Sequence, residues 1–415
     1  MDLSPTEASE KYRAEVVAFL KENLPSDWSG EGALSAEERA EFLPRWREKL
    51  LANGYLGLKW PTEYGGAGLG PLELYIVQEE FARAGVPTLP MPSDLFGFLL
   101  IGPTLMDRGT PEQRERFIPK ILSGEYRFAQ GFSEPEAGSD LFGLRTRGAI
   151  DGDEWVINGQ KVWQTSGDAA NWIFVLVRTE PDAPKAKGIS MLLVPIDQPG
   201  VTVRPIRSMT GENEFCEVFF DDARTSVENI VGERGEGASV TMTLLGYERG
   251  AVDGSKYIEH HDELLRLITL VVEQGRRDDP LIRQRLAWCH SKVEIMRLLG
   301  LRALTTALSG QPPGAQSSLL KLFISQFEAS LTELAMDVLG PEGLMRTGGD
   351  GVASLGPDPL GSPNSANAWQ NVYMTARAAT IYGGSAQIQR NTLAERVLGL
   401  PREPQPATTG TRSAQ

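Results

Sequence analysis

The chain has 415 residues, 41% hydrophobic and 23% charged, which is ordinary for a globular protein of two or three domains. Its net charge of −14 argues against nucleic acid or an anionic membrane as a partner, although a local basic patch could still bind an anion. Cys216 and Cys289 predict buried thiols rather than a disulfide, and three histidines are too few for a transition-metal site. Since a signal peptide and a long apolar run are both lacking, we expect a cytoplasmic protein.

Residues 1–124 carry hydrophobic side chains at helical spacing and predict an N-terminal all-α domain. In 6–23, for example, Val16, Phe19 and Leu20 fall on one side of a helix that Pro25 ends. The same spacing predicts further helices over 36–53, 71–84, 93–107 and 111–123.

Residues 125–236 have a different period, because short β-type runs such as WIFVLVR and CEVFFDD alternate with turn residues. They predict a middle β domain. From 237 to 403 the helical spacing returns and predicts a bundle whose long helices have short connections. These helices are expected over 237–275, 281–309, 316–339 and 385–398, with a Gly- and Pro-rich loop at 346–366 and a flexible tail at 404–415.

Three segments have a composition suited to ligand binding. The first, AQGFSEPEAGSD at 129–140, has glycines and serines that would let backbone N–H groups approach a planar ligand, although an ordinary loop has similar residues. The second, NGQKVWQTSGDAANWIFVLVR at 158–178, contains Trp163, and a tryptophan in a strand is usually packed in the core. The third is IYGGSAQIQRNTLAERVLGLP at 381–401.

Together these segments resemble acyl-CoA dehydrogenases, and the resemblance covers nearly the whole chain. The first segment is similar to the family's Thr/Ser-Glu-Pro-x-Ala-Gly-Ser-Asp motif and the second to its Lys-x-Trp-x-Thr/Ser motif. The resemblance implies an α+β multidomain fold, with an N-terminal helical domain, a middle β-barrel-like domain and a C-terminal four-helix bundle. It also implies FAD as the cofactor, held without a Gly-x-Gly-x-x-Gly turn.

The resemblance assigns the cofactor contacts residue by residue. Trp163 would lie against the flavin, and Thr165 would donate near its N5 atom. Arg276 or Arg277 would replace the family's arginine that reaches the FAD pyrophosphate of a neighbouring subunit. The full set of cofactor-binding residues that it implies is Phe132, Ser133, Gly138, Ser139, Trp163, Thr165, Arg276, Ser385 and Gln387.

One position departs from the family pattern. Many members read Tyr-Glu-Gly-Thr where this chain reads Tyr-Gly-Gly-Ser at 382–385, and their Glu removes the substrate's α-proton. A minority carry this base on a bundle helix in a Glu-Arg pair, which Glu248-Arg249 matches. Two adjacent charged residues on a helix are usually solvated, but the apolar run TLLGY before Glu248 favours a carboxyl with a raised pKa. We therefore expect Glu248 to be the base.

The implied reaction is the FAD-dependent α,β-dehydrogenation of an acyl-CoA to its trans-2-enoyl-CoA. Glu248 would take the α-proton, FAD N5 would accept the β-hydride, and an electron-transfer flavoprotein would receive the electrons. The implied substrate-binding residues are Ser139, Arg249, Gly383 and Gly384. The missing side chain at Gly383 would make room for a branched or steroid-derived acyl group.

The oligomer and two competing functions stay open. Bacterial family members that act on bulky or steroid-type acyl-CoAs include α2β2 heterotetramers of two different chains, and this chain would be the one with the base. A homo-oligomer is the alternative. There are two competing functions. One is a flavin oxidase or monooxygenase on the same fold, and the other is a non-catalytic subunit that supports FAD binding.

Overall fold

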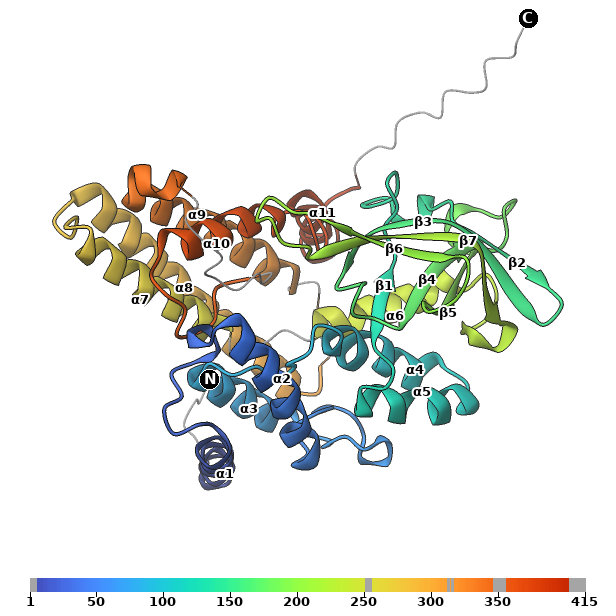
Figure 1. The fold of residues 1–415 in the computed structure, drawn as a ribbon, viewed down its shortest axis with the longest axis horizontal. Helices are drawn as coiled ribbons and strands as arrows, with labels where there is room; N and C mark the ends of the chain where they lie inside the picture. Colours follow the sequence, from blue (N-terminus) through green and yellow to red (C-terminus); the bar gives the residue numbers. More distant parts are fainter. Residues whose placement is uncertain (1–5, 251–255, 312–313, 315–316, 346–355, 403–415) are drawn as a thin grey trace, which may run out of the picture.

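The structure, a computed structural model, describes residues 6–250, 256–311, 314, 317–345 and 356–402. Residues 248–250 are described as helical backbone only, so the side chains of the predicted base Glu248 and of Arg249 lie outside the described part. The four-helix bundle forms one end of the molecule and the β-sheet the other (Figure 1). In the described ranges, no helix has the length and apolar character needed to cross a membrane.

The N-terminal region is helical, as predicted. Its helices are α1 (Glu7–Asn23), α2 (Ala36–Ala52), α3 (Pro71–Ala84), α4 (Gly102–Arg108) and α5 (Pro111–Ser123). Capping boxes at Thr6, Ser35 and Thr110 satisfy the first N–H groups of α1, α2 and α5.

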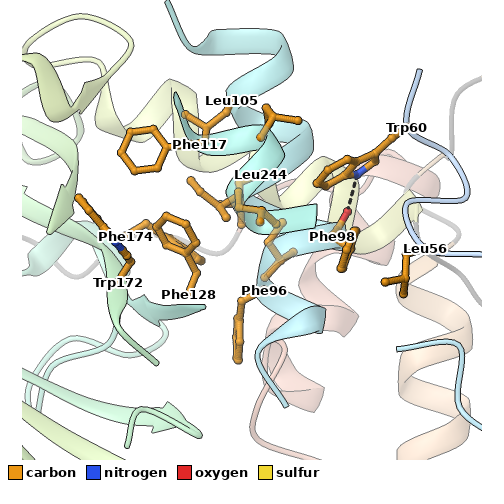
Figure 2. Packing of buried hydrophobic residues seen from close by; sticks show 14 of the residues in the cluster. Leu56, Trp60, Phe96, Phe98, Leu105, Phe117, Phe128, Trp172, Phe174 and Leu244 are labelled. Atoms are coloured by element: carbon orange, nitrogen blue, oxygen red, sulfur yellow. Dashed lines mark hydrogen bonds between the residues drawn. The ribbon is translucent and has the colours of Figure 1, made fainter. Parts of the chain in front are cut away.

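The helix predicted over 93–107 is split into a π-helical stretch, Leu95–Ile101, and α4. A π-helix pairs each carbonyl with the N–H five residues later, and Pro103 has no N–H to offer Phe98. The indole nitrogen of Trp60 donates to the Phe98 carbonyl instead, at 3.0 Å (Figure 2). The irregular turn therefore has its hydrogen bond supplied from a neighbouring loop.

The middle region is an eight-stranded sheet in the order β6-β7-β3-β2-β4-β5-β8, with β1 parallel to β4. The long strands β3 and β7 form an antiparallel pair that contains two bulges. The strands are β1 (Phe128–Gly131), β2 (Arg147–Asp151), β3 (Glu154–Thr165), β4 (Trp172–Arg178), β5 (Ile189–Pro195), β6 (Val201–Ile206), β7 (Phe215–Ser226) and β8 (Ile230–Val231).

Strands β4 and β5 read as continuous apolar runs because both of their faces are buried. One face, with Phe174 and Met191, packs against the helices of the N-terminal region, and the other, with Val175 and Leu192, faces a second core. Cys216 and Cys289 are buried and unpaired, as predicted.

The C-terminal region begins with α6 (Gly237–Gly250), which packs between the sheet and the N-terminal helices. Val240 and Leu244 are fully buried there, and Figure 2 shows Leu244 among Phe96, Phe117 and Phe128. The bundle itself surrounds a separate core and consists of α7 (Lys256–Glu273), α8 (Pro280–Leu308), α9 (Ser317–Leu339) and α10 (Ala366–Ala378). A short helix, α11 (Ala386–Thr392), and a π-helical turn, Leu393–Val397, follow.

The predicted α+β architecture of helices, sheet and helices is confirmed. The helix α10 was not predicted, although Ser365 as N-cap and the helical spacing of Trp369, Val372 and Ala376 are its signals. The Gly- and Pro-rich composition of the preceding loop hid this pattern.

Candidate active site

The loop after β1 is fixed by a buried ion pair between Glu134 and Lys161. The Glu134 carboxylate accepts from the Lys161 ammonium at 2.8 Å and from the backbone N–H groups of Arg145 and Thr146 at 2.6 and 2.9 Å. Lys161 also donates to the carbonyl of Phe132 at 3.1 Å, and its side chain is 0% exposed. One lysine on β3 thus connects the first ligand-binding segment to the second.

Each member of this pair favours the charged form of the other. Burial lowers the pKa of Lys161 to about 8, against the opposing attraction of Glu134. Burial also opposes the charge of Glu134, but Lys161 and the two backbone donors outweigh it and lower the pKa of the carboxyl. The pair is a rigid base for the loop that carries Ser133, Gly138 and Ser139.

The predicted flavin contacts in this loop differ in exposure. Phe132 is buried with its ring edge-on to Phe174, Ser133 is half-buried, and Gly138 and Ser139 are exposed. A Cβ atom at Gly138 would meet no atom within 4 Å, so the backbone there is open to a ligand.

Trp163 is 59% exposed and does not pack in the core of the sheet. Its φ of 70° is unusual for a residue with a side chain, and it sits in a bulge where the register of β3 with β7 shifts between Val162 and Gln164. The bulge turns the indole to the surface, where it touches only the edge of Phe215 among the aromatic rings of the described residues. An exposed indole held by backbone strain is a feature of a binding surface.

The third segment lies near this part of the sheet. Burial raises the pKa of the Tyr382 phenol, and the charges of Glu328 and Glu214 raise it further. The Glu214 carbonyl accepts from Ser166 N–H, next to Thr165. Figure 1 shows α11 beside the connection between β6 and β7. The first two segments therefore meet at the pair of Glu134 and Lys161, and Glu214 places the third segment near the second. In the third segment the side chain of Ser385 caps α11, whereas Gln387 is exposed.

The turn at 379–384 offers unused hydrogen-bond donors. Gly383 and Gly384 have φ of 61° and 86°, which favour glycine. Within the described chain, neither of their N–H groups has an acceptor. Their carbonyls do have partners, because Gln389 donates to Gly383 at 2.9 Å and Lys321 donates to Gly384 at 3.0 Å. Two adjacent free N–H groups are suited to bind an oxyanion.

Position 248 lies in the last turn of α6, one helical turn beyond the buried Leu244. Tyr247 in this turn interacts with Asp107 of α4, and partial burial and this carboxylate raise the pKa of its phenol. The predicted substrate ligand Arg249 follows in the same turn.

The predicted pyrophosphate ligand Arg276 has contacts within its own chain. It donates to the Asp337 carbonyl at 2.7 Å and to the Asp279 carboxylate at 3.0 Å, at the turn between α7 and α8. Arg277 beside it is more exposed, at 72%, and pairs with Asp278. Arg277 is thus the more accessible of the two arginines.

Comparison with known proteins decides the family. The models of the acyl-CoA dehydrogenase N-terminal, middle and C-terminal domains match residues 6–125, 129–223 and 235–398. The chain belongs to the acyl-CoA dehydrogenase family. Acyl-CoA dehydrogenase IpdE1 of Mycobacterium tuberculosis is 42% identical to it, over 95% of this chain and 98% of the relative.

Solved structures agree with this assignment. The structure described as the Tcur3481-Tcur3483 steroid ACAD has a TM-score of 0.77 and 31% identity, and it covers 97% of this chain and 100% of its own. The ChsE4-ChsE5 complex from Mycobacterium tuberculosis has a TM-score of 0.75 and 29% identity, with the same coverage. The predicted resemblance is confirmed, and this acyl-CoA dehydrogenase is an oxidoreductase with a flavin cofactor.

The residues present fit a flavin. The exposed indole of Trp163 offers a flat apolar surface, the open backbone at Gly138 admits close approach, and the half-buried hydroxyl of Ser133 offers a polar contact.

Sequence reasoning missed the residues that hold the site in place. They are Glu134 and Lys161, inside the first two motifs, Gln389, inside the third segment, and Lys321, outside all three. The charged Glu134 and Lys161 in otherwise apolar, small-residue segments were a usable signal. Lys321 had none, because its partners are about sixty residues away in the chain.

Proposed function

We propose that this acyl-CoA dehydrogenase catalyses the FAD-dependent α,β-dehydrogenation of an acyl-CoA to the trans-2-enoyl-CoA, with Glu248 as the base. The observation that carries this proposal is the turn at Gly383, which keeps two unused N–H donors but has no side chain able to abstract a proton. A carboxylate must then come from another element, and Glu248 at the end of α6 is the candidate.

Each residue has a defined task in this proposal. The thioester carbonyl accepts from the N–H of Gly383, which acidifies the α-carbon because the developing enolate oxygen is stabilised. Glu248 takes the α-proton as the Cα–Cβ double bond forms. Arg249 and Ser139 bind the thioester and its CoA portion. The bound FAD supplies the acceptor for the hydride that leaves Cβ.

We infer that Trp163, Thr165, Phe132 and Ser133 contact the isoalloxazine ring. The strained backbone at Trp163 supports this assignment, because strain of this kind is usually retained for a function. Ser385 and Gln387 complete the ring contacts, and Gly138 and Ser139 lie toward the pyrophosphate, which Arg277 or Arg276 of a neighbouring subunit reaches.

The substrate we propose is a ring-bearing acyl-CoA. A glycine at 383 leaves room beside Cα that a glutamate would fill, and Gly384 is exposed beside it. The steroid ACAD among the similar structures supports this class. An electron-transfer flavoprotein is the proposed electron acceptor, in the cytoplasm, where two unpaired buried cysteines are stable.

An α2β2 heterotetramer is the proposed assembly, with a homo-oligomer as the alternative. The helix α8 presents Leu281, Trp288, Ile295 and Leu298 on the surface. Three of these are spaced by seven residues and so share one face of the helix. Exposed apolar surface of this kind is typical of a protein interface, and one similar structure is a complex of two named chains.

The test is anaerobic bleaching of the flavin absorbance with short, branched, long and steroid-derived acyl-CoAs. Wild type is expected to bleach with at least one ring-bearing acyl-CoA. Glu248→Gln is expected to bind FAD but to show no bleaching, whereas the matched control Glu236→Gln, on an exposed residue beside α6, bleaches as wild type does.

Three outcomes would contradict the proposal. Bleaching of Glu248→Gln at the wild-type rate would remove Glu248 as the base. Oxygen consumption in step with substrate would favour an oxidase or monooxygenase. A purified wild-type chain without flavin absorbance would favour a non-catalytic subunit.

A further inference from the structure

The turn that carries the free N–H groups of Gly383 and Gly384 is held by a lysine from the bundle. The Lys321 ammonium, on α9, donates to the carbonyls of Ala379 at 2.8 Å and Gly384 at 3.0 Å. These two carbonyls stand at the two ends of the turn, so one side chain spans it. The cation also lies 5.8 Å from the centre of the Tyr382 ring.

The turn needs this support because its two glycines do not restrict the backbone to one conformation. Glycine populates both left- and right-handed regions at little cost, so two consecutive glycines do not fix the direction of their N–H groups. Gln389 holds one carbonyl at 2.9 Å from within α11, and the Ala386 N–H donates to Thr380 at 2.9 Å. Of these contacts, Lys321 alone connects the turn to a long helix of the bundle.

A positive charge here has a second effect. The ammonium bonds the carbonyls of Ala379 and Gly384, so its charge lies beside the turn and acts on the thioester oxygen through space. Negative charge develops on the thioester oxygen only as the α-proton leaves, so a nearby cation favours the transition state over the bound substrate.

We propose that Lys321 is a positioning residue of the reaction, which orients the turn whose Gly383 N–H binds the thioester carbonyl and places a positive charge beside it. This assignment rests on the proposed function. Lys321 acts through the backbone and does not touch the substrate, and it acts on the removal of the α-proton.

A probe that stops before hydride transfer separates these steps. A 3-thia acyl-CoA has sulfur at the β position, so it cannot be dehydrogenated, while its α-protons remain acidic. Its α-hydrogen exchange with deuterated water, measured by mass spectrometry on the FAD-loaded enzyme, reports the base and the turn alone. Flavin content and the thermal unfolding midpoint are measured for every variant.

Lys321→Met is expected to slow the exchange at least tenfold and to lower kcat more than it changes KM with a reacting acyl-CoA. Lys321→Arg keeps the charge and the donors and is expected to stay within about threefold of wild type, because guanidinium N–H groups can reach both carbonyls. The matched control is Lys292→Met, since Lys292 lies over the rings of Trp288 and Phe323 and has no contact with the turn. It is expected to exchange at the wild-type rate.

The outcomes distinguish the two proposals. Lys321→Met with normal flavin content and wild-type exchange would overturn the role of Lys321 alone. A second outcome is that the wild type exchanges no α-hydrogen with the 3-thia analogues of the short, branched, long and steroid-derived acyl-CoAs. That result would overturn the proposed function and the role of Lys321 with it. Should Lys321→Met not fold, Lys321→Gln provides the same comparison, and wild-type exchange in it would refute the assignment.

Discussion

The buried pair of Glu134 and Lys161 gives the sharpest prediction for stability. Glu134→Gln removes the negative charge but keeps the size of the side chain. The Lys161 ammonium, which is 0% exposed, would then keep only the Phe132 carbonyl and a neutral amide as partners. Lys161→Met is less severe, because Glu134 would keep its two backbone donors at Arg145 and Thr146.

The expected magnitude follows from burial. Breaking a buried ion pair by removing one partner costs about 3–5 kcal/mol, because the remaining charge is left without compensation. This is a large share of a total stability of roughly 5–15 kcal/mol. A charge-assisted hydrogen bond contributes about 1.5–3 kcal/mol, which is the smaller loss expected for Lys161→Met. The control Glu136→Gln should cost less than about 1 kcal/mol, since the side chains of Glu136 and Arg145 are 69% and 78% exposed.

The assay is thermal unfolding of the flavin-loaded enzyme, followed by the release of flavin fluorescence. Glu134→Gln should release flavin at the lowest temperature, Lys161→Met at an intermediate one, and Glu136→Gln at the wild-type temperature. Equal midpoints for Glu134→Gln and Glu136→Gln would refute the idea that the buried pair stabilises the loop.

Three further predictions test other parts of the molecule. Trp163→Ala should raise the Kd of the apo-protein for FAD by about tenfold. The reason is that stacking of two rings contributes about 0.5–1.5 kcal/mol beyond the burial of their apolar surface. An unchanged Kd in calorimetry would contradict the contact between Trp163 and the flavin. Asp358 is paired with Arg266, and burial raises the pKa of its carboxyl from 3.8 to about 6. The folded state therefore binds this proton more tightly than the unfolded state. As a result, the wild type loses stability as pH rises through this range. Urea unfolding at pH 4 and 7 should show wild type losing up to about 3 kcal/mol relative to Asp358→Asn, and a difference independent of pH would be inconsistent with this shift. Leu298→Glu on α8 should reduce the oligomer mass in light scattering, while Ile150→Glu, on an exposed residue of β2, should not; an unchanged mass for Leu298→Glu would remove that face from the interface.

The periodicity of the chain was enough to predict most elements, because it depends on which face of each element is buried. The helices α1, α2, α3, α5, α8 and α9 begin and end close to the expected residues. Prediction was weakest where local composition and tertiary packing disagree. The helix α10 follows a Gly- and Pro-rich loop, and in the π-helical stretch at Leu95–Ile101 Trp60 supplies a donor that Pro103 lacks.

The site divides in the same way. The sequence by itself determined the family, the segments that form the site, and the absence of a base at Gly383, because these depend on residue identity and order. Tertiary structure alone decided that Trp163 is exposed, that Lys161 supports the loop of Phe132, and that Lys321 holds the glycine turn. The reason is physical: a backbone bulge, a buried charge and a contact across about sixty residues depend on how the elements pack, which the spacing of residues along the chain does not specify.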